Sequence, residues 1–236
     1  QQRGLAAEVE RKSLKTQWAK RNRSRVKGLQ PEGFLWAFPS IVRNIEVLEE
    51  SAKGIGVFTF KPAVDGIVRQ VPLVVRVGNF MYPTLALELY RVATRQTTMA
   101  IDYGAGGING VKLKGLDVPT DRFGQIWMKF GKHDRSLYVS AKDILNGTAD
   151  PKKLSGKLAF FGTSAIGLLD IKATPLDAAI PGVEVHAQLL QNILDKNYLA
   201  RPPWALGAEL VAMIMVGVLM VLLVPFLGAI WTLVAA

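Results

Sequence analysis

Four polar side chains that could contact a ligand lie in residues 162–175 (GTSAIGLLDIKATP): Thr163, Ser164, Asp170 and Thr174. This stretch follows four apolar residues, 158–161 (LAFF), which we expect to form a short buried strand. Ligands of α/β proteins bind beyond the carboxyl ends of such strands, so the stretch is the best candidate for a pocket. The alternative is a structural loop in which Asp170 caps backbone N–H groups.

The chain has two histidines, His133 and His186. His133 lies in the polar sequence KHDR, which predicts a solvated turn. His186 falls in the first turn of a helix predicted for residues 184–196, where the helix dipole disfavours the imidazolium form. Two roles remain open for His186: a hydrogen bond to a neighbouring loop carbonyl, or a direct part in ligand or proton sensing.

Several kinds of chemistry are disfavoured by residue type. There is no cysteine, which excludes disulfides and cysteine-based zinc sites, and with two histidines we expect neither a metal nor a cofactor. The glycine-rich residues 103–110 (YGAGGING) lack the dinucleotide-binding spacing, because Asn109 stands in place of the last glycine. No nucleophile–base pair is visible, so we predict no catalytic residue.

Alternating strands and helices must position these residues. Helices are predicted over residues 39–51, 84–95, 139–146 and 184–196, and strands over residues 54–60, 68–77 and 158–161, with a strand hairpin across residues 108–130. Asp65 and Gly66 predict a tight turn before Arg69, because Asp-Gly tolerates a left-handed backbone. The pattern indicates an α/β fold, a mixed sheet covered by helices.

The C-terminal region has the composition of a membrane segment. No charged residue occurs between Leu210 and Ala236, and a helix needs about 20 apolar residues to cross the hydrocarbon core. Pro225 leaves two alternatives: a kinked transmembrane helix over residues 204–229, or a helical hairpin whose first span ends near Val224.

The two ends of this region differ. Arg201, Pro202, Pro203 and Trp204 are typical of a membrane entry, and we predict that they couple the preceding domain to the span. No basic anchor follows the apolar run, so we expect the membrane region of residues 204–236 to be truncated here and to continue.

The net charge of +10 is concentrated at the N-terminus. Residues 1–27 hold nine of the 29 basic residues and two of the 19 acidic ones, so the rest of the chain is nearly balanced and we expect no nucleic acid partner. Residues 1–29 are predicted to be a basic helical segment. It is either a solvated surface helix or a contact with anionic lipid headgroups.

Two groups of motifs carry a family resemblance. The first is Asp65-Gly66-x-x-Arg69-x-x-Pro72-Leu73, followed by Pro83-Thr84-Leu85-Ala86-Leu87-Glu88. The second is Gly162-Thr163-Ser164-Ala165, Gly167-Leu168-x-Asp170, Thr174-Pro175 and Pro181-Gly182-Val183-Glu184-Val185-His186-Ala187. In order and spacing, residues 30–225 resemble the CHASE type 2 domain, an extracellular sensory domain associated with bacterial cyclases and histidine kinases.

The resemblance implies a function and a location. Residues 30–203 would be a periplasmic sensory domain of a bacterial inner-membrane receptor. The domain would receive a small-molecule or protein signal. Membrane lipid would surround the spans, and the partner would be a second copy of the chain or a membrane complex. The output would be a class III adenylate or guanylate cyclase, or a kinase. The alternative is an accessory or docking subunit of an inner-membrane complex.

The resemblance also suggests site residues, and the sequence differs from the family pattern in two ways. Asp65, Arg69, Asp170, Thr174 and His186 would contact a ligand or form a polar network at the ends of the sheet. Ala63 stands where the family has an aspartate, which weakens a paired-acid site. The first strand–helix section of the family does not precede the basic segment, so we expect the N-terminal part of the domain to be missing.

Overall fold

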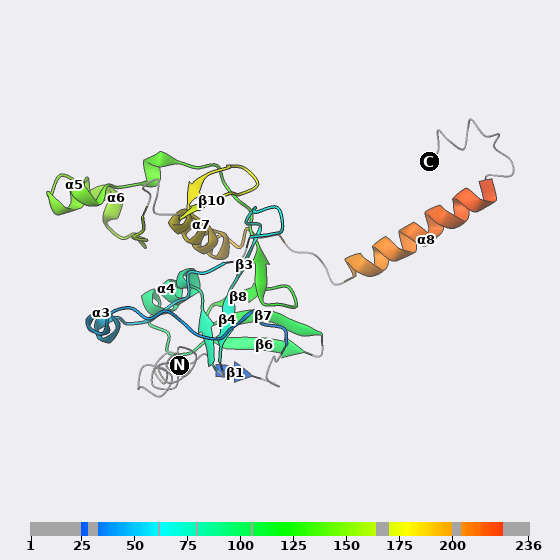
Figure 1. Cartoon of the computed structure of the whole chain (residues 1–236), viewed down its shortest axis with the longest axis horizontal. Helices are drawn as coiled ribbons and strands as arrows, with labels where there is room; N and C mark the ends of the chain where they lie inside the picture. The colour runs from blue at the N-terminus through cyan, green and yellow to red at the C-terminus, as the bar shows by residue number, and fades with distance from the viewer. Residues whose placement is uncertain are drawn as a thin grey trace, which may run out of the picture. The chain divides into compact units, whose positions relative to one another are not determined.

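A computed structural model describes residues 25–27, 33–60, 62–78, 80–104, 106–163, 170–199 and 204–223 (Figure 1). The chain divides into two compact units, residues 1–200 and residues 201–236. The first unit carries all the described strands and every described helix but one, so each unit is treated by itself.

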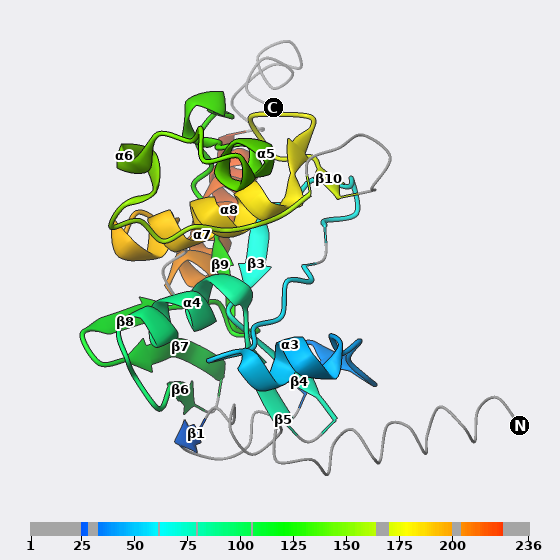
Figure 2. The ribbon, with the colours of Figure 1, turned by 90° about the vertical axis from the view of Figure 1, so that its left-hand side faces the viewer.

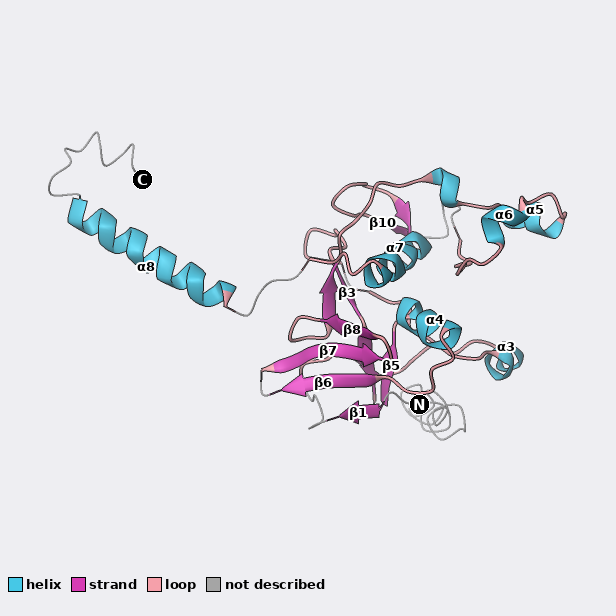
Figure 3. Cartoon of the chain, turned by 180° about the vertical axis from the view of Figure 1, so that it is seen from behind, coloured by secondary structure: helices cyan, strands magenta, loops and turns pink. Residues whose placement is uncertain are grey.

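The largest sheet of the first unit is a meander with one added strand (Figure 3). Its members, in spatial order, are β1 (Arg25–Lys27), β6 (Ala100–Gly104), β7 (Gly107–Leu113) and β8 (Leu116–Pro119). β1 is parallel to β6, whereas β6, β7 and β8 are antiparallel neighbours. Because β1 contains residues 25–27, the end of the predicted basic helical segment is a strand; residues 1–24 lie outside the described residues.

Three smaller sheets complete the strand pairing. They are β2 (Ala37–Phe38) parallel to β4 (Val74–Val77), which is antiparallel to β5 (Phe80–Pro83); β3 (Gln70–Pro72) with β9 (Gln125–Trp127); and β10 (Ile171–Lys172) with β11 (Ile180–Pro181). The predicted α/β class is confirmed, with parallel and antiparallel pairs. The structure divides the strands among several small sheets, where the sequence suggested one.

The described helices differ greatly in length. They are α3 (Glu46–Ser51), α4 (Leu85–Ala93), η1 (Arg135–Leu137), α5 (Ala141–Leu145), α6 (Pro151–Leu154), α7 (Gly182–Leu194) and α8 (Ala205–Leu223). α4 packs against α7 (Figure 2). The helix predicted over residues 184–196 is confirmed as α7, with Val185, Leu189 and Ile193 fully buried at the expected spacing.

The core lies between these helices and the strands. Val68, Leu73, Ile101 and Ile126 are all fully buried in one cluster with the inner face of α7. Burying each such side chain stabilises the fold by about 1.5–3 kcal/mol before the entropy cost of ordering it.

A buried ion pair within α4 lies against the extended segment that contains Gly54. Glu88 is 4% exposed and accepts hydrogen bonds from Arg91 at 2.8 and 2.5 Å. Gly54 lies directly against this carboxylate, so a β-carbon there would overlap Glu88 Oε1. The close approach explains why a residue without a side chain stands at this position.

Three predicted elements are shorter or divided in the structure. The helix predicted over residues 39–51 begins at Glu46, because the Glu49 carboxylate binds the Arg43 guanidinium and the Asn44 N–H and keeps the preceding residues out of the helix. The predicted strand 68–77 divides at Leu73 into β3 and β4, which pair in different sheets. The hairpin predicted across residues 108–130 is three strands, because a tight turn at Gly115 (φ 83°) separates the first strand from the second.

Two predicted strands are wrong among the described residues. In residues 54–60 only Val57 pairs, as an isolated bridge to Thr84. Residues 158–161 are in no strand, and Leu158 and Phe161 are 43% and 88% exposed. Both segments have an apolar composition typical of buried strands, but neither has a full neighbouring strand to pair with in the described part of the chain.

The second unit contains α8, whose large apolar side chains are exposed. Among the described residues, no helix combines the length and the apolar character needed to cross a membrane, so the predicted transmembrane helix is not confirmed. Arg201, Pro202, Pro203 and residues 224–236 lie outside the described residues. The two alternatives for the membrane region, and its predicted continuation, therefore stay predictions.

Candidate functional site

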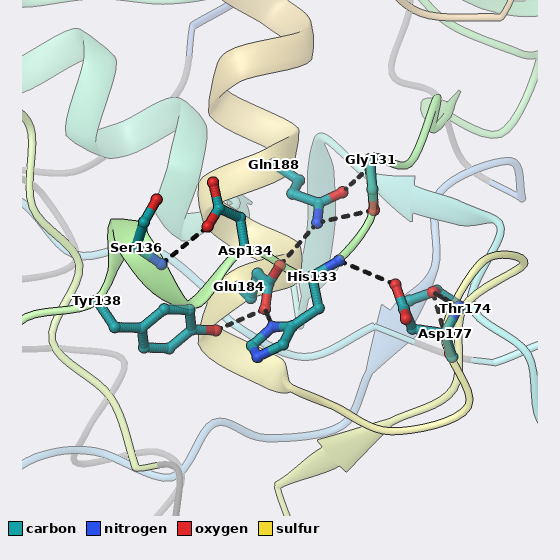
Figure 4. Close-up of polar contacts among 9 residues, drawn as sticks. All are labelled: Gly131, His133, Asp134, Ser136, Tyr138, Thr174, Asp177, Glu184 and Gln188. Atoms are coloured by element: carbon teal, nitrogen blue, oxygen red, sulfur yellow. Dashed lines mark hydrogen bonds and ion pairs between the residues drawn. The ribbon is translucent and has the colours of Figure 1, made fainter.

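The first turns of α7 gather polar side chains from several distant segments (Figure 4). Glu184, Gln188 and Asn192 follow one another at four-residue spacing, which places them along one face of the helix. Residues 129–138 run beside this face and supply most of the partners. The opposite face of α7 is packed into the core, so the helix is fixed on one side and bonded on the other.

Glu184 is the centre of this group. Its carboxylate accepts hydrogen bonds from the Tyr138 hydroxyl at 2.5 Å, from His133 Nδ1 at 2.6 Å and from Gln188 Nε2 at 3.0 Å. Glu184 is only 9% exposed, and a buried carboxylate needs such donors to offset its lost hydration. Burial, together with the hydrogen bond to Glu184, raises the pKa of Tyr138 well above its usual value of 10.0.

Two amide side chains bind the backbone that runs beside α7. Asn192 accepts from the Lys129 N–H at 2.9 Å and donates to the Lys129 carbonyl at 3.1 Å. Gln188 accepts from the Gly131 N–H at 3.0 Å. The bonded residues are two apart, which is the period of an extended chain, so these side chains take the place of a neighbouring strand.

Asp177 joins this segment to the loop after β10. Its carboxylate accepts a hydrogen bond from the His133 backbone N–H at 3.0 Å. Thr174 is buried and closes the turn, because its hydroxyl donates to the Asp177 carbonyl and accepts from the Asp177 N–H, both at 3.1 Å. Thr174 therefore positions Asp177, and through it His133.

His186 faces a different segment. Its Nε2 donates to the Phe58 carbonyl at 3.0 Å, and its ring lies 5.3 Å from the ring of Phe60. The side chain is 3% exposed, and burial lowers its pKa below 6.5. Nδ1 is buried and has no hydrogen-bond partner among the described residues. The arrangement matches the first of the two roles considered for His186, a bond to a neighbouring loop carbonyl.

Asp170 lies at the beginning of α7. Its carbonyl accepts from the Gly182 N–H at 2.7 Å, and its carboxylate packs so closely on Gly182 that a side chain there would overlap it. Lys172 Nζ is 3.3 Å from the Asp170 carboxylate and 5.8 Å from the centre of the Phe60 ring. A carboxylate in this position is stabilised by the positive end of the helix dipole.

Asp65 and Arg69 form a two-point ion pair at the surface, with distances of 2.9 and 2.7 Å. The guanidinium of Arg69, aided by the Ile67 N–H, lowers the pKa of Asp65 to about 2. Both side chains are more than a third exposed, so the pair adds little to stability. The turn they brace lies beside the loop after β10, since Val68 N–H donates to the Ala173 carbonyl at 2.8 Å.

The structure thus brings some of the sequence candidates together. Asp170 contacts the beginning of α7, and His186 lies within its first two turns. Thr174 is connected to the same helix through Asp177 and His133. Asp65 and Arg69 pair with each other. Thr163 is exposed, and Ser164 lies outside the described residues. Trp204 is exposed in the second unit.

Sequence reasoning missed the residues with most bonds. His133 had been predicted to be solvated, which is wrong, because Glu184 and Tyr138 hold its ring at the domain's surface. Glu184, Gln188 and Asn192 could have been found from their four-residue spacing. Tyr138 and Asp177 carry no local signal, since their roles depend on contacts far apart in the sequence.

The chemistry open to this group is limited. Glu184 accepts hydrogen bonds from three donors, which suits a clamp that holds α7 better than a free base. No group of three or more His, Cys, Asp or Glu side chains able to hold a metal occurs among the described residues. What the group can do is fix the position of α7, or release it if one of these bonds is exchanged for another.

Comparison with known proteins supplies the context for this arrangement. The family model described as the CHASE2 domain matches residues 2–224, which confirms the resemblance drawn from the motifs. The match includes the basic segment at the N-terminus as well as the candidate residues. Searches of curated proteins and of solved structures returned no match.

Proposed function

Because the chain belongs to the CHASE2 domain family, whose members are extracellular sensory domains, we propose that it senses a signal and passes it on through α7. The finer proposal is a periplasmic sensory domain of a bacterial inner-membrane receptor. The output that it controls is most simply a class III adenylate or guanylate cyclase, with a kinase as the other option.

One observation supports α7 as the transmitting element. Its first turn is bonded to side chains from residues 133–138 and lies against Asp170, while its last turn leads along the chain toward residues 201–204. A ligand shifts an equilibrium only if it binds two conformations differently. A signal that competes for Glu184 or Asp170 would change the bonds that hold α7, and so meets this requirement.

The composition of residues 204–236, which carry no charge after Glu209, supports membrane attachment. Pro202 and Pro203 fix two backbone φ angles between α7 and the apolar region. We propose that this stiffness carries a displacement of α7 into the region that follows.

The experiment uses the whole receptor gene that contains this chain, expressed in a bacterial strain without its own cyclases. Glu184→Gln should change the basal level of cyclic nucleotide, because it weakens three bonds that hold α7. Replacing Pro202 and Pro203 by glycine should abolish that change. Glu50→Gln, at an exposed carboxylate, is the matched control and should have no effect.

The outcomes separate the parts of the proposal. If the glycine variant responds to Glu184→Gln as strongly as the parent, coupling through the two prolines is wrong. If no receptor variant produces cyclic nucleotide above the empty strain, the cyclase output is wrong, and phosphate transfer is measured instead.

A second function, an accessory or docking subunit of a membrane complex, is favoured by one observation. Residues 134–163 contain no buried residue, and five of their large apolar side chains are exposed: Leu137, Ile144, Leu145, Leu158 and Phe161. Exposed apolar surface of this kind is typical of protein contacts. Co-purification of a membrane complex from the native host, together with a receptor gene that encodes no output domain, would favour this function over sensing.

A further inference from the structure

An arginine in the turn between β8 and β9 lies against two aromatic rings. The guanidinium carbon of Arg122 is 5.5 Å from the centre of the Phe34 ring and 5.0 Å from that of the Phe123 ring. The Tyr103 ring in turn meets Phe34 edge to face, with 5.9 Å between the ring centres. Arg122 and Phe123 are exposed, so this arginine–aromatic cluster of four residues is part of the surface.

The turn that carries Arg122 is held by the side chain before it. Asp121 Oδ1 accepts hydrogen bonds from the Phe123 and Gln125 N–H groups, both at 2.9 Å. The other carboxylate oxygen accepts from Gln70 Nε2 at 3.3 Å. Both oxygens of Asp121 are thus used within the turn and by β3, and no ion pair joins this carboxylate to Arg122. A fixed turn lowers the ordering cost that a ligand of Arg122 must overcome.

The glycine-rich residues 103–110 allow the arginine and the rings to approach one another. Gly107 has a φ of 120°, and a β-carbon there would lie 2.5 Å from the Arg122 carbonyl oxygen and 3.0 Å from the Phe34 ring. Its neighbour Gly106 is exposed, with no atom within 4 Å of an added β-carbon. These glycines, which lack the spacing for a dinucleotide, therefore shape the surface around the cluster.

The hydrogen-bond donors of the Arg122 side chain are unused. Within the part of the chain that the structure describes, the guanidinium makes no hydrogen bond and no ion pair. Aromatic rings attract the cation but offer no oxygen to its N–H groups. A guanidinium has five such donors in a planar fork, which matches the two oxygens of a carboxylate.

We propose that the arginine–aromatic cluster binds a small organic carboxylate that carries an aromatic ring. Arg122 bonds both carboxylate oxygens, and the exposed ring of Phe123 contacts the ring of the ligand. The cluster supplies one positive charge, which suits a monoanion better than a phosphate dianion. Four side chains also suit a small molecule, because a stable protein interface takes about 20–30 residues on each side.

The test uses the whole chain in micelles of a non-ionic detergent, with para-fluorobenzoate as the probe observed by fluorine NMR. We expect saturable binding at about pH 7.5, where the carboxyl group is ionised, and none to micelles without protein. The neutral para-fluorobenzamide keeps the ring and should bind at least about tenfold more weakly. The corresponding phenylphosphonate, mostly a dianion, should also bind more weakly than the carboxylate.

Two exposed arginines give a matched pair of variants. Arg122→Gln should weaken binding of para-fluorobenzoate at least about tenfold, because it removes a charged donor pair. Arg135→Gln, on η1 and without a ring contact among the described residues, should bind like the parent. Both side chains are at the surface, so both variants should melt like the parent in circular dichroism.

Two further variants separate charge from geometry. Arg122→Lys keeps the charge but loses the planar fork, so it should also bind more weakly than the parent. Phe123→Leu keeps an apolar side chain but loses the ring, and should weaken binding by about two- to fivefold.

Four results would overturn the proposal. Absence of saturable binding is the first, and equal binding to Arg122→Gln and the parent is the second. Equal binding of the benzamide would mean apolar adhesion without a role for the carboxylate. Tighter binding of the phenylphosphonate would make the site one for phosphate-like anions. Because the probe is measured without an output domain, these results do not bear on whether the chain signals through α7.

Discussion

At the residue scale, the hydrogen-bond partners of Asp65 and Glu184 have different effects. Asp65 is exposed and owes its low pKa to one guanidinium and one backbone N–H. Glu184 is buried and held by three donors that tie distant parts of the chain to α7. The first pair is an electrostatic feature of the surface, whereas the second group is part of the scaffold.

The pKa of Asp65 gives a direct test of its pairing. Arg69→Gln removes the main cause of the shift, so the pKa of Asp65 should rise from about 2 toward its usual 3.8. The measurement is a carbon-13 NMR titration of the aspartate carboxyls. Lys112→Gln, which affects the separate pair with Asp102, should leave Asp65 unchanged. An Asp65 that still titrates near 2 in Arg69→Gln would show that the backbone N–H dominates.

His186 should make the stability of the domain depend on pH. Because burial lowers its pKa in the folded state, the unfolded chain binds the proton first as the pH falls below 6.5. Stability is therefore full above 6.5 and is lost toward lower pH, by up to about 1.4 kcal/mol per pH unit until the folded pKa is reached.

The comparison variant is His186→Gln, whose amide can still donate to the Phe58 carbonyl. Urea unfolding at pH 7.5 and 5.5 should show a smaller loss of stability in this variant than in the parent. His133 is present in both proteins and cancels in the difference. Equal losses would mean that His186 is protonated as easily in the folded chain as in the unfolded one.

At the element scale, the sequence predicted what local periodicity determines. α7 was predicted within two residues because Val185, Leu189 and Ile193 recur at helical spacing. Residues 54–60 and 158–161 were predicted to be strands from composition, but a strand exists only where another pairs with it, and that information is not local. The predicted start of α3 was wrong for a similar reason, because a contact of Glu49 with Asn44, and not a local propensity, determines where the helix begins.

The close approach of Gly54 to α4 predicts that a side chain at this position destabilises the fold. Gly54→Ala should displace the Glu88 carboxylate from Arg91 and leave buried charge poorly paired, at a cost of about 3 kcal/mol in the free energy of unfolding. Gly106→Ala, where no atom lies within 4 Å of the added carbon, should change it by less than about 0.5 kcal/mol. Chemical denaturation measures both, and equal values would contradict the role given to Gly54.

At the scale of the whole molecule, the motifs identified the family, and the site was predicted only in part. Asp170 and Thr174 were candidates from their loop and His186 from its helix, and all three also lie in family motifs; the structure places them in α7 or beside its partners. The network around Glu184 was not found, since His133 and Tyr138 reach it across about 50 residues of chain, from a segment whose sequence reads as a polar turn.

Membrane attachment is the prediction at this scale. Expressed with a periplasmic export signal, the chain should remain in the membrane fraction after carbonate washing, because residues 210–236 carry no charge. A version that ends at residue 203 should appear in the soluble periplasmic fraction. If the whole chain is also released by carbonate, the C-terminal region does not anchor it.

The four-residue spacing of Glu184, Gln188 and Asn192 has a mechanical consequence. Because the backbone at Lys129 and Gly131 is bonded to side chains one helical turn apart, a slide of α7 along its axis by a fraction of a turn breaks both bridges at once. The next position with similar side chains opposite that backbone lies a full turn away, about 5.4 Å. A displaced α7 would therefore regain both bridges only after a shift of a full turn. Under a graded stimulus, α7 would change register in one step. Each molecule would then respond in an all-or-none way, and only the average over many molecules would vary with the strength of the stimulus.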